Sequence, residues 1–481
     1  MLPKSPRFAF SDILLDKLIV EIEPRLRDKG AGVCQPIAAD NIRLFGELQS
    51  PLITSLQGSY VPDTNCYRSI PYNANFGMLV FRKDLFEHDQ SRLSKQNVAN
   101  EMRLAYKDQN KALRDAYGHV AQTQYSDSDQ YNVNDETLGN LAAAAVEGAA
   151  PEVWEQLIAL CILTSKRFLV ETQTFDTIMC TLLEIVWGFG GDFRVRRDYH
   201  IEGERTIVEM QLFQALFLFR YMLNRGVILR NSTMDVKVLE DPTMHNQRTA
   251  ECLFGRHWYS TLVDLLTTRR EDRETHAWLW DASRLFDGSR RSDSQRVKLE
   301  ICKIPVSLLQ FFRAHAKGTK PVHSSCWGDW HFAVLAGSEN GRLAERLINH
   351  FMSSHKVREM AFAGAIVPTV EYFYHTVGTG GASWPRYAER RCLDLAERPE
   401  IDQPTTTYND LYKEFFPTAR SRSGIFDYRH CMHELHGVLE FVRNMPTGIE
   451  ITEKEAITLK ERIKDACDSI VALRNRELIV H

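Results

Sequence analysis

The chain has 481 residues and a mass of 55.4 kDa, which is more than one hydrophobic core usually supports. Its formal net charge is −4 and 25% of its residues are charged, so no strong field of one sign is available to recruit nucleic acid or anionic lipid. We therefore expect more than one domain and neither a nucleic-acid nor a membrane partner.

The N-terminal sequence MLPKSPRFAFSDILLDKL has no continuous apolar run followed by a small-residue cleavage site, as a secretory signal would have. The cysteines form no C-x-x-C pair, and Cys161 and Cys180 lie in apolar stretches, where free thiols behave as small hydrophobes. This pattern is typical of a reducing compartment, so a cytoplasmic location is predicted.

Residues 1–121 are predicted to form a smaller, mixed N-terminal domain. Amphipathic helices are expected at 11–28 and 92–118, and residues 50–83 contain turn residues and short β-like runs. Residues 122–150 begin with a polar, aperiodic stretch rich in Asp, Asn and Ser, which predicts a linker or long loop.

Residues 151–481 are predicted to form a helical domain that binds a cofactor and a substrate. Apolar residues recur at three-four spacing from Trp154 to Gly188, and the segment 205–223 repeats the pattern before Gly226. The predicted fold class is therefore all-α, or mainly α, with a large helical bundle. Further helices are expected at 256–268, 274–285, 296–315, 341–375, 384–396, 428–444 and 452–478.

The most specific local feature is the run VGTGGAS at residues 377–383. Its glycines allow positive φ and close approach of the backbone to a flat ligand, and Thr379 adds a hydroxyl. The same run also suits a helix terminator in which Ser383 caps the next helix. A dinucleotide-binding loop fits less well, because the third glycine of G-x-G-x-x-G falls at Ser383. The predicted ligand-binding residues of this loop are Gly378, Thr379, Gly380 and Gly381.

The sequence GTGGAS after a long helix resembles the GTGGSS or GTGGT loop of the tryptophan and indoleamine 2,3-dioxygenase superfamily, which includes ring-rearranging enzymes of pyrrolnitrin biosynthesis. Residues 219–223 (FRYML) are similar to the Phe/Leu-Arg-x-Tyr-Leu segment of that family, with the tyrosine one position early. The resemblance implies an all-α, haem-dependent oxygenase-like oxidoreductase of secondary metabolism. It would hold haem b, use O₂ or peroxide, and act on an indole or other aromatic amino-acid-derived substrate.

The resemblance implies that Arg220 holds the substrate carboxylate. The residues around it also allow a simpler interpretation, since a guanidinium in so apolar a segment can reach solvent or pair with another helix. No catalytic side-chain base is assigned, and a homo-oligomer is possible.

The resemblance also implies a histidine ligand to the haem iron on the helix before the glycine loop. His375 is too close to Gly378, because three residues span only about 11 Å. His355, which precedes a strongly apolar helix, is slightly favoured over His350 as the haem axial ligand and thus as the metal-binding residue. His331 ranks third because it is most distant in sequence.

Two other functions remain open at this point. His430, His433 and His436 could contribute to a non-haem metal site, although residues six apart do not align on one straight helix. The chain could also be a cofactor-free helical binding or interaction protein, in which the glycine run is only a turn. The aromatic-rich segments that include Trp327 and Trp330 could stack on the ring of a ligand, but such residues more often belong to the core, which is the favoured interpretation.

Overall fold

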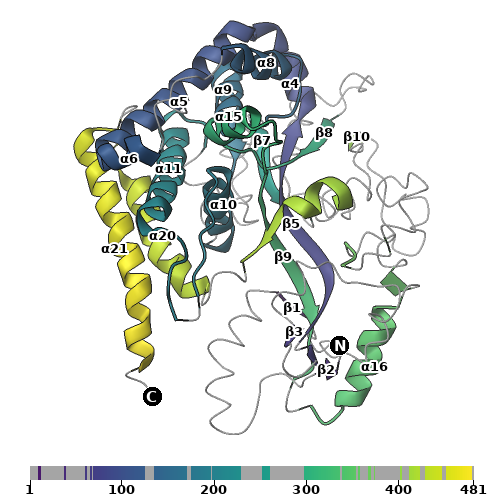
Figure 1. The fold of residues 1–481 in the computed structure, drawn as a ribbon. Coiled ribbons are helices and arrows are strands. Elements are labelled where there is room, and N and C mark those ends of the chain that lie inside the picture. Colours follow the sequence, from purple (N-terminus) through teal and green to yellow (C-terminus); the bar gives the residue numbers. More distant parts are fainter. Residues whose placement is uncertain are drawn as a thin grey trace, which may run out of the picture.

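The fold is described from a computed structural model of the 481-residue chain (Figure 1). The residues that the structure describes are 9–11, 37–38, 60–61, 66–67, 69–124, 135–170, 175–196, 198–228, 252–259, 297–335, 338–353, 356–357, 367–369, 373, 401–402, 411–422, 428–446 and 451–478.

A sheet of mixed strand direction runs through the molecule, and its longest strand is β5 (Ile70–Arg82). The other strands are β1 (Ala9–Ser11), β2 (Ile37–Ala38), β3 (Tyr60–Val61), β4 (Cys66–Tyr67), β6 (Arg167–Leu169), β7 (Cys252–Trp258), β8 (Val297–Cys302), β9 (Ser325–Phe332), β10 (Ile401–Asp402) and β11 (Ala419–Ser421).

Strand β5 holds two groups of strands together. Its first part, from Ile70 to Phe76, is antiparallel to β9, which in turn pairs with β1 and, in parallel, with β11. Its second part is antiparallel to β7 on one edge and to β8 on the other. Strand β6 is parallel to β7, and β10 is parallel to β8. Strands β2, β3 and β4 form a separate small sheet in the order β2-β4-β3.

Most of the helices gather on one side of this sheet, whereas α16 (Gly341–Phe351) lies apart from them, beyond the long strands β5 and β9 in the view of Figure 1. The helices are α4 (Lys83–Asp89), α5 (Lys95–Tyr117), α6 (His119–Gln124), α8 (Asp135–Val146), α9 (Trp154–Thr164), α10 (Phe175–Gly188), α11 (Arg205–Asn224), α15 (Leu308–Ala316), α16 (Gly341–Phe351), α20 (Tyr428–Asn444) and α21 (Glu453–Leu478), with short helical turns η4 (Gln90–Arg92), η10 (Leu411–Phe415) and η11 (Phe416–Thr418).

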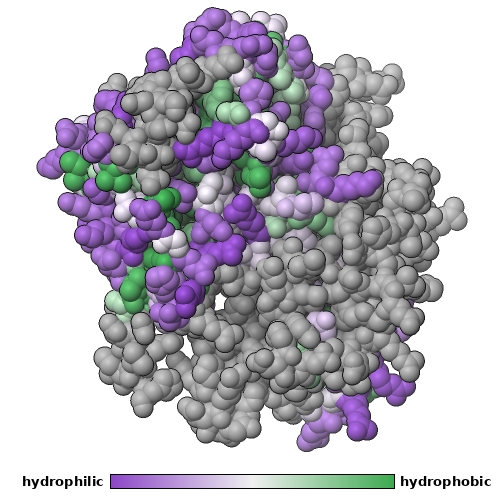
Figure 2. All heavy atoms as spheres, viewed as in Figure 1, coloured by the Kyte–Doolittle hydropathy of each residue, from purple (hydrophilic) through white to green (hydrophobic). Residues whose placement is uncertain are grey.

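The central helices of this group are α10 and α11, which are buried along most of their length and form one core with α5, α9, α20 and α21. The outer helix α5 starts at the N-cap Ser94, whose hydroxyl accepts a hydrogen bond from Asn97 N, and ends at Gly118 with φ +54°. Figure 2 shows a mainly hydrophilic outer surface over this group, with apolar side chains scattered among the polar ones. No described helix combines the length and apolar character needed to cross a membrane.

The predicted all-α fold class is wrong, because a mixed sheet runs through the molecule. Strand β7 begins before and runs into the helix predicted at 256–268, and β8 occupies the start of the helix predicted at 296–315. The expected continuous pattern from Trp154 to Gly188 is divided into α9, β6 and α10. Ser165, in the left-handed region with φ +55°, ends α9.

Four helix predictions are confirmed, with small shifts at their ends: 92–118 is α5, 205–223 is α11, 428–444 is α20 and 452–478 is α21. Within the helix expected at 341–375, the structure has α16 as the first part, and of the few later residues that it describes, 367–369 are not helical. The helices expected at 11–28, 274–285 and 384–396 lie outside the described residues. The division into 1–121, 122–150 and 151–481 stays a prediction, and the structure places α8 within the middle segment.

Candidate functional site

One face of the sheet carries two asparagines and two tryptophans from three neighbouring strands. Asn73 lies opposite Trp330, Asn75 opposite Gly328, and Gly77 opposite Trp258. Directly opposed residues of antiparallel strands project to the same face, as do residues two apart along one strand. Asn73, Asn75, Trp258 and Trp330 therefore share a surface, which we call the Asn–Trp face.

The Asn–Trp face becomes more open along β5. Near Gly77 it is covered by α10, whose residue Cys180 accepts a hydrogen bond from the Cys326 thiol through its backbone oxygen. Further along, Asn73 and Asn75 are half-buried, and Trp330 is 41% exposed. An exposed tryptophan in the middle of a sheet leaves a large apolar ring available to a ligand.

A buried ion pair fixes the covered end of this face. Arg256 and Glu184 form two side-chain hydrogen bonds of 2.9 and 2.7 Å, and their side chains are 1% and 0% exposed. Glu184 Oε1 also accepts a hydrogen bond from the backbone N–H of Cys326 at 2.9 Å, which connects α10 to β9. Burial tends to lower the pKa of Arg256, but the Glu184 carboxylate outweighs it and raises that pKa.

Gly77 makes room for this pair. A Cβ at that position would lie 2.0 Å from Glu184 Oε1 and 2.6 Å from Arg256 Nη2. A glycine is therefore needed where the β5 backbone passes the two charged groups.

The ring of Trp258 lies close to two guanidinium groups. The Arg256 guanidinium lies 4.2 Å from the ring centroid and that of Arg422 lies 5.8 Å from it. A Cβ on Gly328 would approach the Trp258 ring to 3.3 Å. These contacts give the indole one position at the inner edge of the Asn–Trp face.

Hydrogen-bonding groups flank the exposed ring. Asn73 Oδ1 accepts the backbone N–H of Val367 at 2.8 Å, which orients its amide and leaves the two amide hydrogens for another partner. An indole ring beside the oriented Asn73 amide suits a flat ligand with apolar C–H groups on one side and hydroxyl groups at its edge.

Sequence reasoning missed this surface. The core is the favoured interpretation for both Trp327 and Trp330, and only Trp327, at 1% exposed, lies there, whereas Trp330 is free for the stacking role that ranks second. The useful signal was period-two spacing: Asn73, Asn75 and Gly77 alternate with buried Ala74 and Phe76.

The predicted ligand-binding loop, Gly378, Thr379, Gly380 and Gly381, lies outside the described residues, as do His355 and His375. His350 is exposed near the end of α16. His331 is buried on β9, where Nδ1 lies 3.0 Å from Ser69 Oγ and Nε2 lies 3.0 Å from Asp329 Oδ1. Of the two described histidines, neither His350 on α16 nor His331, which projects from the opposite face of β9 to Trp330, lies on the Asn–Trp face.

Arg220 is buried in α11 at 2% exposed. Its Nη2 lies 3.5 Å from Glu455 Oε1 on α21 and 3.4 Å from the backbone oxygen of Pro446. The guanidinium thus pairs with another helix, as the simpler sequence interpretation expects. Its predicted role in binding a substrate carboxylate stays untested.

The C-terminal histidines lie on α20, where the rings of His433 and His436 are each 5.2 Å from the Phe175 ring. His436 Nε2 is 3.6 Å from Glu440 Oε1. Among the residues that the structure describes, no group of three or more His, Cys, Asp or Glu side chains could hold a metal ion. The non-haem metal hypothesis for His430, His433 and His436 is therefore not supported.

No family model matches the chain, and no curated protein matches it. Solved structures match its fold over nearly the whole length. An ABC transporter solute-binding protein from Thermotoga lettingae TMO, bound with α-D-tagatose, is 12% identical with a TM-score of 0.52, and the match covers 97% of this chain and 84% of that chain. One from Agrobacterium radiobacter K84, in complex with ribitol, is 12% identical with a TM-score of 0.50 and the same two coverages, 97% and 84%.

A third match is a protein proposed to be an oligosaccharide periplasmic-binding protein, from Synechococcus sp. MITs9220 and in complex with zinc. It is 11% identical with a TM-score of 0.52, and the match covers 96% of this chain and 85% of that chain. At this level of identity the likeness concerns the fold.

These matches overturn the dioxygenase resemblance and what it implied. The chain has the fold of solute-binding proteins rather than that of an all-α haem enzyme. The predictions of a haem-dependent oxidoreductase, haem b, an aromatic substrate and O₂ or peroxide are therefore wrong, and His355 and His350 lose their proposed role as haem ligands. The alternative of a cofactor-free helical binding or interaction protein is not supported either, because the molecule contains a mixed sheet.

The predicted cytoplasmic location is overturned as well. Proteins with this fold are described as ABC transporter solute-binding proteins, and one of them as periplasmic-binding. Scattered free cysteines misled the prediction, because buried thiols such as Cys161 and Cys180 serve as small core residues in any compartment.

Proposed function

We propose that the chain binds a sugar or polyol on the Asn–Trp face and delivers it to an ABC transporter. The observation that carries the proposal is the placement of the exposed Trp330 ring beside the oriented amide of Asn73 on one sheet face. The ring would stack on the C–H side of the ligand, and the amide hydrogens would be donated to its hydroxyl oxygens.

The fold supports this ligand class. Two of the matched solute-binding proteins contain α-D-tagatose and ribitol, both small polyhydroxylated molecules. Rigid strands position the ring and the amide before the ligand arrives, which reduces the entropy lost on binding.

Trp330→Ala should weaken sugar or polyol binding about tenfold, because truncation removes the stacking surface at the centre of the site. The measurement is isothermal titration calorimetry with the tightest-binding member of a panel that includes maltose, D-tagatose and ribitol. Trp330→Phe keeps an aromatic ring and should recover most of the affinity.

Leu343→Ala is a matched control, since Leu343 is 63% exposed on α16 and lies outside the Asn–Trp face. It should bind as the unmodified chain does. Equal affinities for the unmodified chain and Trp330→Ala would refute the assignment of the stacking ring.

A further inference from the structure

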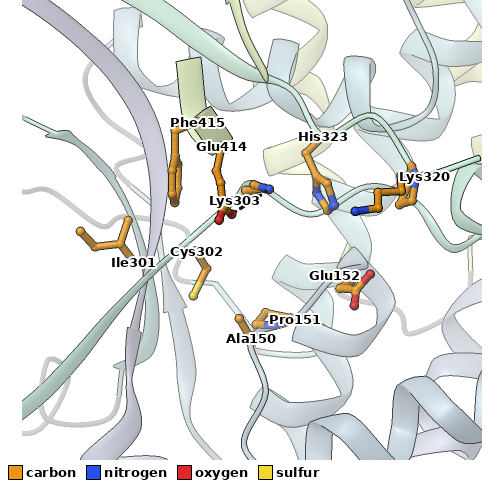
Figure 3. A pocket seen from close by; sticks show the side chains of 11 residues that line it. Ala150, Pro151, Glu152, Ile301, Cys302, Lys303, Lys320, His323, Glu414 and Phe415 are labelled. Atoms are coloured by element: carbon orange, nitrogen blue, oxygen red, sulfur yellow. Dashed lines mark ion pairs between the residues drawn. The ribbon is translucent and has the colours of Figure 1, made fainter. Parts of the chain in front are cut away.

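A pocket lies outside the Asn–Trp face, on other elements of the fold (Figure 3). The pocket has a volume of about 730 Å³, within the range of small-molecule sites. Four segments line it: residues 150–152 before α9, 301–303 at the end of β8, 320–323 before β9, and 414–415 at the end of η10.

Opposite charges line the pocket, and only part of them are paired. Lys303 Nζ lies 3.2 Å from Glu414 Oε2 on one side. Lys320, His323 and Glu152 lie on the other side (Figure 3), and both Lys320 and Glu152 are exposed. Within the described part of the chain, neither Lys320 nor Glu152 forms an ion pair. Among the described residues that line it, the pocket therefore presents the Lys320 ammonium and the Glu152 carboxylate to a ligand.

His323 adds a hydrogen-bond acceptor and no charge. Its Nδ1 lies 2.9 Å from the backbone oxygen of Ile304, and because a carbonyl only accepts, Nδ1 carries the hydrogen. Burial lowers the pKa of His323, so the ring is neutral at pH 7 and Nε2 is an acceptor.

The remaining lining is apolar. Phe415, Ile301 and Cys302 are buried side chains at the pocket wall, and Pro151 lies beside Glu152. Lys320 would attract a simple anion, but the Glu152 carboxylate would repel it. Glu152 would attract a simple cation, but Lys320 would repel it. The lining fits a molecule that carries both charges and an apolar side chain.

We propose that this pocket is a second ligand site that takes a short zwitterionic peptide with apolar side chains. The terminal carboxylate pairs with Lys320, the terminal ammonium pairs with Glu152, and a backbone N–H is donated to His323 Nε2. The side chains lie against Phe415, Ile301 and Pro151. The volume favours two or three residues over a single small amino acid.

The probe is the dipeptide Leu-Leu, measured by isothermal titration calorimetry on the full chain, with N-acetyl-Leu-Leu and Leu-Leu-amide as charge-deleted analogues. Lys320→Met should weaken the binding of Leu-Leu about five- to tenfold. It should not change the affinity for Leu-Leu-amide, which lacks the terminal carboxylate and already binds weakly to the unmodified chain. Glu152→Gln should weaken Leu-Leu similarly and leave the acetylated analogue unchanged. Exposed Lys317 and Glu147 provide the matched controls Lys317→Met and Glu147→Gln, which should bind as the unmodified chain does.

Absence of Leu-Leu binding would overturn the proposal, as would equal affinities for Leu-Leu and its two analogues. An adverse result here does not bear on sugar or polyol binding, because Lys320→Met and Glu152→Gln leave the Asn–Trp face intact. The same two variants should therefore keep the unmodified affinity for the sugar or polyol.

Discussion

Glu184→Gln should lower the free energy of unfolding by about 3–5 kcal/mol, because it leaves the Arg256 guanidinium charged and unpaired inside the protein. Both side chains of the pair are almost completely buried. Glutamine can still accept the Cys326 N–H, so the main loss is the charge. Urea denaturation followed by circular dichroism measures the change.

Two controls separate the buried charge from the substitution itself. The double variant Glu184→Gln/Arg256→Met removes both charges and should recover most of the loss. Glu300→Gln makes the same change in the exposed pair with Lys83, where the side chains are 36% and 42% exposed, and should cost less than about 1 kcal/mol. If Glu184→Gln cost no more than Glu300→Gln, the ion pair would not stabilise the fold as described.

Glu155→Gln should abolish a loss of stability that the unmodified chain shows as pH rises from about 4.5 to about 7. Glu155 is 1% exposed, and its Oε2 accepts the Leu308 N–H at 2.8 Å. Its buried Oε1 has no hydrogen-bond partner within the part of the chain that the structure describes. Burial raises the pKa of Glu155 from 4.5 to about 7, against the effect of hydrogen bonds from the backbone N–H groups of Glu155 and Leu308.

The direction follows from proton binding. Between pH 4.5 and about 7 the folded state keeps the Glu155 proton and the unfolded state releases it, so stability falls as pH rises through this window. Over this whole pH window the free energy of unfolding of the unmodified chain falls by about 3 kcal/mol through Glu155. Glutamine is neutral throughout, and the difference in unfolding free energy between variant and unmodified chain should therefore grow by this amount in favour of the variant.

Chemical denaturation at pH 4.5 and pH 8 measures this difference. Glu152→Gln changes an exposed carboxyl close to Glu155 in sequence and should leave the pH dependence almost as it is. A parallel pH profile for Glu155→Gln and the unmodified chain would mean that the buried carboxyl does not titrate in this range.

Long helices could be predicted from the sequence because their periodic burial depends on local spacing. In α20, for example, Cys431, Met432, Leu435, Val438 and Leu439 repeat at three-four intervals and are all buried. In α21 the capping residue Thr452 and Glu455 exchange hydrogen bonds at the start of the predicted helix. Each of these signals lies within a few consecutive residues.

The sheet could not be predicted in the same way. Residues 76–82 of β5 are buried on both faces, so the strand reads as a continuous apolar run without alternation. Strand β7 is also buried throughout except at Trp258. Its charged residue Arg256 is tolerated only because Glu184, 72 residues earlier, lies opposite it.

The candidate site depends on the same long-range register. Trp330 and Asn73 meet because β9 pairs with β5, and no local pattern connects two residues so distant in sequence. The glycine-rich run, by contrast, was locally specific but led to an incorrect family, since short glycine motifs serve many loops.

The central claim is that the chain binds a sugar or polyol. Isothermal titration calorimetry of the unmodified chain against maltose, D-tagatose, ribitol and a wider panel of sugars and polyols tests it most directly. We predict saturable one-site binding of at least one member with a dissociation constant below about 1 mM. No binding of any member at concentrations of about 10 mM would contradict the claim.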